Sequence, residues 1–217
     1  MKIVHAGHHI ITPISEDGMQ ELKDLERIAR VCYKSEDKIE EDGSSAQKLI
    51  LRLITSGHEA MLEHKHLTVL FVCDRAISHE LVRHRLCSFA QESQRYCNYS
   101  KDKFGNEITF VQPWWLDDED DVGYRDWKSA CAESERAYLK MLDFGYTPQQ
   151  ARGVLPNCVK TEIVVTANYR EWRHIFKLRT APDAHPDMQW LMNGLLRDVQ
   201  KAIPIVFDDI PVKKVKR

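Results

Sequence analysis

The sequence predicts an α/β protein, a single compact domain with a mixed central sheet and helices packed on it. Segments with the β-branched or alternating character of strands occur between segments whose apolar residues recur every three or four positions, as in helices. The two kinds of segment alternate imperfectly, which argues against a doubly wound parallel sheet. The 217 residues suffice for one domain with a full core, so we assign residues 1–217 to one domain and expect a frayed tail at 213–217.

The first half of the sequence contains both kinds of pattern. Strand segments are rich in Ile, Val and Thr, and helical segments carry Leu, Ile and Ala at helical spacing. The expected elements are strands at 2–12 and 67–73, and helices at 17–34, from Ser44 to a stop at Gly57, and at 76–83.

The second half continues the mixture. The dense acidic run 117–121 predicts a solvated loop or helix start. Thr147 followed by Pro148 predicts a capped short helix that presents Arg152. Further expected elements are a strand at 108–111, a helix at 124–144 with Ala130, Ala137, Tyr138 and Leu142 on one face, a strand entering a helix within 161–170, and a helix at 187–203.

Composition and charge limit the class of partner. The net charge of -2 gives no electrostatic reason to expect a nucleic acid or an anionic membrane. No apolar run approaches the roughly 20 residues that span a bilayer, and the N-terminus lacks the apolar core of a signal peptide. The six cysteines form no CxxC pair and are typical of reduced thiols. We therefore expect a cytoplasmic protein.

Basic residues gather in one stretch of the chain. Arg83, His84 and Arg85 are consecutive, and Ser93 and Arg95 follow shortly after. Arginine is rarely buried without a partner, and its planar guanidinium matches phosphate and carboxylate oxygens. The stretch is either a site for a phosphorylated ligand or a solvated basic face paired with nearby acids, and charge alone favours neither.

The order and spacing of the residues in this stretch are more informative than its charge. Arg83-His84-Arg85, seven residues and then Ser93 resembles the signature of the flavin-dependent thymidylate synthases, and Gln94-Arg95-Tyr96 continues it. The block 151–156, the Asn-x-Arg of Asn168 to Arg170 and the Leu-Arg ending at Arg179 also resemble that family in order and spacing. The resemblance covers approximately residues 53–190.

The resemblance implies an enzyme that methylates dUMP to dTMP without a cysteine nucleophile. It implies FAD as cofactor, methylenetetrahydrofolate as carbon donor and NADPH as hydride source. It also implies a homotetramer with active sites at subunit interfaces. Hydride chemistry would belong to the flavin, while the protein supplies position and charge.

The resemblance also assigns residues to the two ligands. Arg179 is the expected catalytic residue, because a cation against the pyrimidine would favour a ring deprotonated at N3 and raise electron density at C5. The family often has a hydroxyl residue where Ala60 stands, so a contact there would come from the backbone. The FAD set is His58, Ala60, Glu63, Arg83, His84, Arg85, Gln91, Asn168, Arg170 and His174. The dUMP set is Glu80, Arg83, Gln91, Glu92, Ser93, Gln94, Arg95, Arg152 and Arg179.

Three alternatives stay open. A non-catalytic nucleotide-binding regulatory protein would keep the same arginines. A zinc hydrolase would need an HExxH motif, but the segments that begin at His58 and His79 end in Leu62 and Arg83, so we expect no metal. Cys158 follows Pro156-Asn157 and superficially resembles the nucleophile of cysteine-dependent thymidylate synthases, although a structural thiol is the default interpretation.

Overall fold

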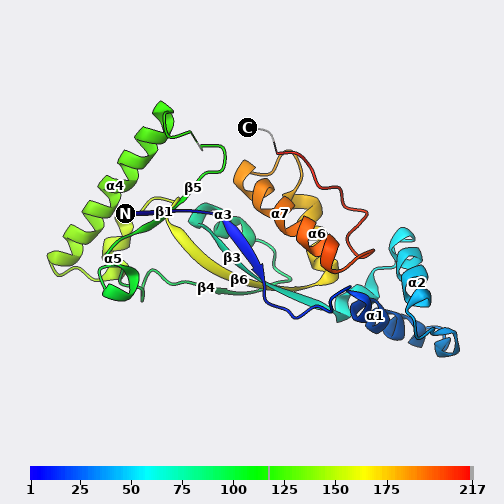
Figure 1. The fold of residues 1–217 in the computed structure, drawn as a ribbon. Helices are drawn as coiled ribbons and strands as arrows, with labels where there is room; N and C mark the ends of the chain where they lie inside the picture. Colours follow the sequence, from blue (N-terminus) through cyan, green and yellow to red (C-terminus); the bar gives the residue numbers. More distant parts are fainter. Residues whose placement is uncertain (117, 216–217) are drawn as a thin grey trace. The chain divides into compact units, whose positions relative to one another are not determined.

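The computed structural model describes residues 1–116 and 118–215 (Figure 1). The strands are β1 (Lys2–His5), β2 (Gly7–Ile10), β3 (His66–Asp74), β4 (Ser88–Gln91), β5 (Thr109–Gln112) and β6 (Lys160–Asn168). The α-helices are α1 (Met19–Val31), α2 (Ser44–Thr55), α3 (Arg75–Leu81), α4 (Val122–Asp143), α5 (Pro148–Ala151), α6 (Tyr169–Arg179) and α7 (Pro186–Ala202). Short 3-10 helices are η1 (Glu36–Lys38), η2 (Ala60–His64), η3 (Asp102–Phe104) and η4 (Arg152–Val154).

The α/β class is confirmed, and the strands belong to two sheets. One sheet has four strands in the order β2-β3-β6-β4. The other pairs β1 with β5 in parallel, with Lys2 opposite Thr109 and His5 opposite Gln112. Strands β3 and β6 lie at the centre of the larger sheet, and their alternate residues are buried, as the pleat requires.

The chain forms two compact units. Unit 1 comprises residues 1–8, 70–83 and 89–164, and unit 2 comprises 9–69, 84–88 and 165–217. The division falls within the long strands β3 and β6, which each pass from one unit into the other. Among the described residues, no helix combines the length and the apolar character needed to cross a membrane.

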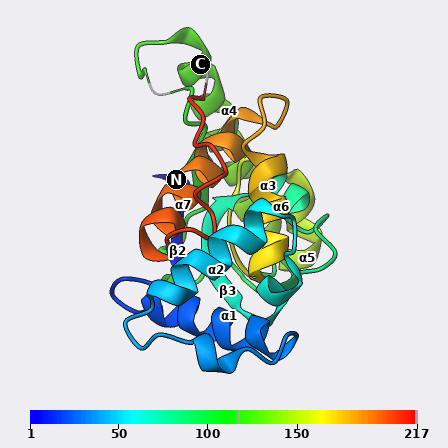
Figure 2. The same cartoon turned by 90° about the vertical axis from the view of Figure 1, so that its right-hand side faces the viewer.

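Unit 2 is built mainly from helices. Helices α1 and α2 lie side by side through apolar stripes, and α7 packs against α6 (Figure 2). Within α6, Trp172 stacks near Phe176 at a ring-centroid distance of 5.6 Å, and its indole N–H donates to the Leu67 carbonyl at 2.9 Å. Gly18 is the N-cap residue before α1 and has a φ of 67°, and a Cβ there would lie 2.2 Å from the Ala202 carbonyl oxygen, so only glycine fits.

Unit 1 has its own core around α4 and β5. Tyr124, Cys131 and Tyr138 are the buried residues of α4. Tyr138 packs in a cluster with Tyr99 and Phe110. The prediction that Ala130 shares the face of Tyr138 was wrong, because Ala130 is exposed and Cys131 takes the buried position.

The ends of several elements differ from the predictions. The expected strand over 2–12 is two short strands, and the helix expected over 17–34 begins at Met19 and ends at Val31. Asp121 caps α4 by accepting from the Gly123 N–H at 2.6 Å, as a helix start does, whereas residue 117 of the acidic run lies outside the described residues. Of the expected tail, 216 and 217 also lie outside them, and the Lys213 N–H donates to Asn193 Oδ1 at 2.7 Å.

Candidate functional site

Helix α6 positions most of the polar groups that unit 2 gathers. Strand β6 ends at Asn168, whose side-chain oxygen accepts from the Glu171 N–H at 2.8 Å and caps the helix. The cap uses Oδ1, so a ligand contact from Asn168 would come from its Nδ2 amide. The helix then carries Arg170, His174 and Arg179 from its first turn to its last residue.

Four residues of the predicted FAD set line one cavity of about 720 Å³ in unit 2. They are Glu63, Asn168, Arg170 and His174. The volume falls within the usual range of about 300–1,000 Å³ for ligand sites. The remaining lining residues are Glu59, Leu86, Glu171, Arg173 and Lys177. The structure thus groups side chains from η2, the segment after His84 and α6 that lie far apart in the sequence.

The cationic side chains at this cavity are paired with carboxylates, and they differ in how far they are exposed to solvent. Arg170 forms an ion pair with Glu63, and both side chains are about half exposed. Arg173 is 1% exposed and donates from Nε to Glu59 at 3.0 Å. Lys177 lies 4.0 Å from the same carboxylate. An anionic ligand could therefore compete with Glu63 for Arg170, whereas Arg173 is held inside the protein.

His84, the centre of the predicted motif, is 6% exposed and lies beside α6. Its Nε2 accepts a hydrogen bond from Arg179 Nε at 2.9 Å, and its ring lies 6.0 Å from that of His174 in an edge-on arrangement. Burial, and then the charges of Arg179 and His174, lower the pKa of His84 from 6.5 to about 4. His84 is therefore neutral at physiological pH, and Arg179 keeps its charge beside it.

His84, Glu171 and His174 form a cluster whose ligand atoms lie within 4.8 Å of one another. Two histidines and a carboxylate are a usual set for a transition metal. However, Arg179 already donates to Nε2 of His84, so the proton of the neutral ring must sit on Nδ1, the nitrogen that faces Glu171 at 3.7 Å. A metal at Nδ1 would require loss of that proton beside a guanidinium, so we interpret the cluster as a hydrogen-bonding arrangement.

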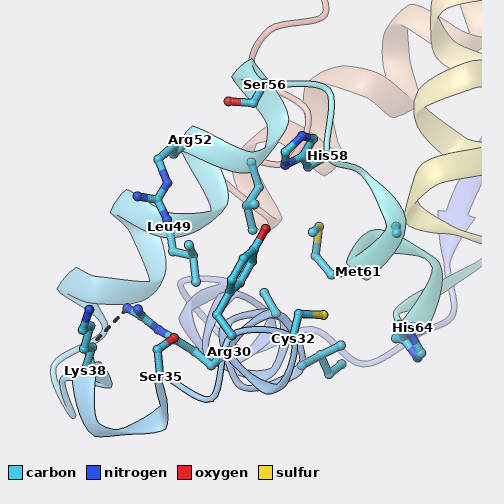
Figure 3. Close-up of a pocket in the computed structure, with 15 residues that line it drawn as sticks. Arg30, Cys32, Ser35, Lys38, Leu49, Arg52, Ser56, His58, Met61 and His64 are labelled. Atoms are coloured by element: carbon cyan, nitrogen blue, oxygen red, sulfur yellow. Dashed lines mark hydrogen bonds between the residues drawn. The ribbon is translucent and has the colours of Figure 1, made fainter.

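A second cavity of unit 2, of about 740 Å³, lies among α1, α2 and η2 and includes His58 and Ala60 of the predicted FAD set (Figure 3). Figure 3 shows His58 and Met61 on one side of it and Leu49 of α2 on the other. Its basic side chains are Arg30, Lys38, Arg52, His58 and His64, and the described residues that line it include no carboxylate. The cavity suits an anionic ligand with an apolar portion.

Two residues of the predicted dUMP set in unit 1 take part in internal hydrogen bonds. Gln91 Nε2 donates to Ser78 Oγ of α3 at 2.9 Å and to Thr161 Oγ1 at 3.3 Å. Glu92 accepts from the Tyr99 hydroxyl at 2.8 Å and from Lys160 Nζ at 3.1 Å. The Glu92 carboxylate therefore belongs to a network with Tyr99 and Lys160, an arrangement that the motif did not indicate.

The other predicted residues lie as follows. Ser93 Oγ accepts from the Arg95 N–H at 3.3 Å, and the Arg95 guanidinium lies 5.5 Å from the Tyr96 ring centroid. Gln94 is half buried beside them, and Glu80 is half buried in α3. Arg152 begins η4, after the short helix that Thr147 and Pro148 predicted. Arg83 is exposed in unit 1, and Arg85 is exposed in unit 2.

The two predicted ligand sets divide between the units. Arg83 and Gln91 of the FAD set belong to unit 1, and its other members belong to unit 2. The dUMP set shows the opposite division, with Arg179 alone in unit 2. Each set is therefore described unit by unit. Within unit 2, four members of the FAD set line one cavity, namely Glu63, Asn168, Arg170 and His174.

Sequence reasoning missed Glu171, Glu59 and Lys177, which line the same cavity as the predicted residues. Glu171 directly follows Arg170 of the Asn-x-Arg motif, and Glu59 directly follows His58. Adjacency to motif residues was the available signal. It was inconclusive, because acids near a helix start are common for reasons of capping and the helix dipole.

Cys158 lies in unit 1, half buried against the core cluster of Tyr138 and Cys131. Its Sγ is 3.5 Å from Cys131 Sγ, and the hydrogen bond between these thiols together with burial raises the pKa of Cys131. Such packing is that of a structural thiol.

Comparison with known proteins identifies the family. The family model described as thymidylate synthase complementing protein matches residues 17–205. The chain belongs to this family. The flavin-dependent thymidylate synthase of Pyrococcus abyssi is 36% identical over 77% of this chain and 67% of its own length. Those of Corynebacterium aurimucosum and Geobacter sulfurreducens are 32% and 35% identical, over 96% and 83% of this chain and 87% and 78% of their own lengths.

A solved structure with the same fold is the UMP/dUMP methylase PolB from Streptomyces cacaoi, bound with 5-Br dUMP. It superposes with a TM-score of 0.77 over 96% of both chains at 23% sequence identity. The likeness establishes that this member of the thymidylate synthase complementing protein family shares the fold of that methylase.

Proposed function

We propose that the protein is a flavin-dependent thymidylate synthase that methylates dUMP to dTMP with FAD as its cofactor. Membership of the thymidylate synthase complementing protein family and the names of the curated relatives support the reaction. The observation on this chain that carries the proposal is the grouping of Glu63, Asn168, Arg170 and His174, all predicted flavin residues, around one cavity of unit 2.

The side chains that line the two cavities of unit 2 have the chemical groups that a flavin dinucleotide needs. Its pyrophosphate needs cationic or N–H donors, which Arg170 and Lys177 supply at one cavity and Arg30, Lys38 and Arg52 supply at the other. Its ring edges need amide and imidazole groups, which Asn168 and His174 supply. The chain has no Gly-rich dinucleotide cradle, so these side chains would do the binding.

We assign dUMP to the residues that the motif indicates. Ser93, Gln94, Arg95 and Arg152 would hold the nucleotide through hydrogen bonds and charge. Arg179 would lie against the pyrimidine, where its cation favours negative charge on the ring and so raises electron density at C5. Because its partner His84 is neutral, the contact between them does not cancel that charge.

When bound, the flavin would supply the hydride chemistry, and the chain would bind, orient and polarise the reactants. Methylenetetrahydrofolate would provide the carbon and NADPH the reducing equivalents. No enzyme cysteine is needed in this route, which agrees with the packing of Cys158 against Cys131.

The proposal includes the assembly and location that the family implies. We infer a homotetramer with active sites at subunit interfaces, a cytoplasmic location, and chain segment 1–217 acting as one domain. No metal is part of the proposed site. Light scattering of the purified protein measures the assembly, and a stable, active monomer would rule out the tetramer.

Flavin content tests the proposal. We expect purified protein to be yellow, with close to one flavin per chain, and stripped protein to rebind FAD. Colourless, folded protein that does not bind added FAD would leave the regulatory nucleotide-binding alternative. Activity that chelators abolish would instead favour the zinc hydrolase.

A further inference from the structure

Glu171 is a buried carboxylate that the motif does not include. It is 8% exposed and lies in the first turn of α6, and its Oε1 faces His84 Nδ1 at 3.7 Å. The other nitrogen of the same ring, Nε2, accepts from Nε of Arg179, the last residue of α6, at 2.9 Å. Glu171 in the first turn of α6 and Arg179 at its last residue therefore face the two different nitrogens of the buried His84 ring.

The chemistry of these groups fixes where the proton lies. A guanidinium Nε carries a hydrogen and has no lone pair to accept with, so His84 Nε2 must be the unprotonated nitrogen. The proton of the neutral ring then lies on Nδ1 and points toward the Glu171 carboxylate. At 3.7 Å the contact is longer than a direct hydrogen bond, but a carboxylate facing an N–H dipole still favours this tautomer.

We propose that Glu171 is a positioning residue, whose carboxylate holds His84 in the Nδ1–H tautomer so that Nε2 orients the Arg179 guanidinium. Without the carboxylate, the Nε2–H tautomer becomes accessible. Its N–H would oppose the Arg179 N–H, donor against donor, and the guanidinium would be displaced.

Two other roles for Glu171 lead to different expectations. As part of a metal site, Glu171 would need His84 and His174 to offer lone pairs to the ion, whereas Arg179 already occupies one lone pair of His84. As a simple helix residue, Glu171 would only favour the positive end of the α6 dipole, and its loss would lower stability without changing the His84 tautomer.

The kinetic consequence rests on the proposed function, because it requires Arg179 to act on dUMP. Carboxylates that orient histidines at metal sites contribute about 10–100-fold to affinity or activity. We expect Glu171→Leu to lower kcat/KM for dUMP by about tenfold or more. We expect Glu171→Gln to stay within about threefold of the wild-type protein, because its amide oxygen can still accept from Nδ1–H.

The tautomer can be measured without any turnover. NMR of the full-length protein with 15N-labelled histidine distinguishes protonated from unprotonated ring nitrogens, and the His84→Gln variant identifies the His84 signals. We expect Nδ1–H in the wild-type protein and in Glu171→Gln, and a population of Nε2–H in Glu171→Leu. Glu133→Leu removes an exposed carboxylate paired with Arg136 on α4 and is the matched control, with no expected change.

The outcomes separate the two proposals. Nε2–H in the wild-type protein would overturn the inference, and so would a Glu171→Leu protein that keeps both Nδ1–H and full turnover per folded molecule. If Glu171→Leu does not fold, Glu171→Ala is measured in its place, with the same expected population of Nε2–H. A wild-type protein that makes no dTMP would defeat the proposed function, while the tautomer measurement would still decide the role of Glu171. A change in the 15N signals of the His84 ring on chelator treatment would support a metal and contradict the inference.

Discussion

Two arginines of α6, Arg173 and Arg179, lie six positions apart in very different surroundings. Arg173 is 1% exposed, and its terminal nitrogens donate to Asp209 at 2.6 and 2.8 Å and to the Val206 carbonyl, while Nε donates to Glu59 at 3.0 Å. Arg179 is half buried, and its Nε donates to His84, a neutral ring.

Under the proposed function, Arg173 is a structural cation and Arg179 is a cation that acts on the substrate. The charge of Arg173 is compensated by two carboxylates, and it joins α6 to Glu59 at the start of η2 and to the C-terminal segment at Val206 and Asp209. The hydrogen bond from Arg173 holds the pKa of Asp209 below its usual value. The neutral ring of His84 adds no charge of its own to the contact with Arg179, and under the proposed function that guanidinium acts on the substrate.

The largest effect is expected from Arg179→Ala. Removing a cation that acts on the reacting ring lowers the rate of dTMP formation by about 10²–10³-fold, as for a deleted electrostatic donor. Circular dichroism is expected to show an intact fold. A folded Arg179→Ala protein with normal turnover would remove the distinction between the two arginines.

Arg173→Met is expected to act on stability. Removing one partner of a buried ion pair usually costs about 3–5 kcal/mol, and partial exposure of Asp209 reduces the expected loss to about 2–3 kcal/mol. Chemical denaturation measures it. Arg136→Met, which breaks an exposed ion pair of α4, is the control and is expected to show no measurable change. Equal stability of the two variants would show that the Arg173 network contributes little.

A pH titration of stability sharpens the account of His84. The pKa of His84 is lowered from 6.5 to about 4, so the unfolded state takes up a proton at a higher pH than the folded state does. The contribution of His84 to stability is therefore complete above pH 6.5 and falls by on the order of 2 kcal/mol as the pH decreases toward 4. His84→Gln is expected to lack this component of the decline. A wild-type curve that is flat from pH 6.5 to 4 would contradict the buried neutral ring.

The smallest effect is expected from Cys158→Ala. The change removes one sulfur atom next to Cys131 and costs about 1–2 kcal/mol of stability, by analogy with small core truncations. Turnover by the folded variant is expected to stay within about threefold of wild type, because no transition-state contact is lost. A folded but inactive Cys158→Ala protein would favour a cysteine nucleophile.

Much of the fold could be predicted because local patterns are strong in β3, β6 and the long helices. Thr147-Pro148 gave the start of α5 because capping chemistry is local. The division of 2–12 into β1 and β2 was not predictable, because both strands have the same character and pair in different sheets. Cys131 lies seven positions before Tyr138, and this spacing places both on one face of α4, whereas Ala130 lies about 80° away around the helix.

The residues of the site could also be predicted only in part. The motif predicted the residues Asn168, Arg170 and His174, and these line one cavity. Sequence could not show that Arg173 meets Asp209 and Glu59, which lie 36 and 114 positions away, since charge pairing at such distances depends on the folded chain. Nor could it show that Glu171 faces His84.

The most direct test of the central claim is the conversion of dUMP to dTMP by the purified protein. The assay supplies FAD, NADPH and methylenetetrahydrofolate, and chromatography separates the two nucleotides, with each component omitted in turn. The account predicts that dTMP forms only when flavin, carbon donor and dUMP are all present. Folded, FAD-loaded protein that makes no dTMP, or dTMP formation that continues without flavin, would contradict it.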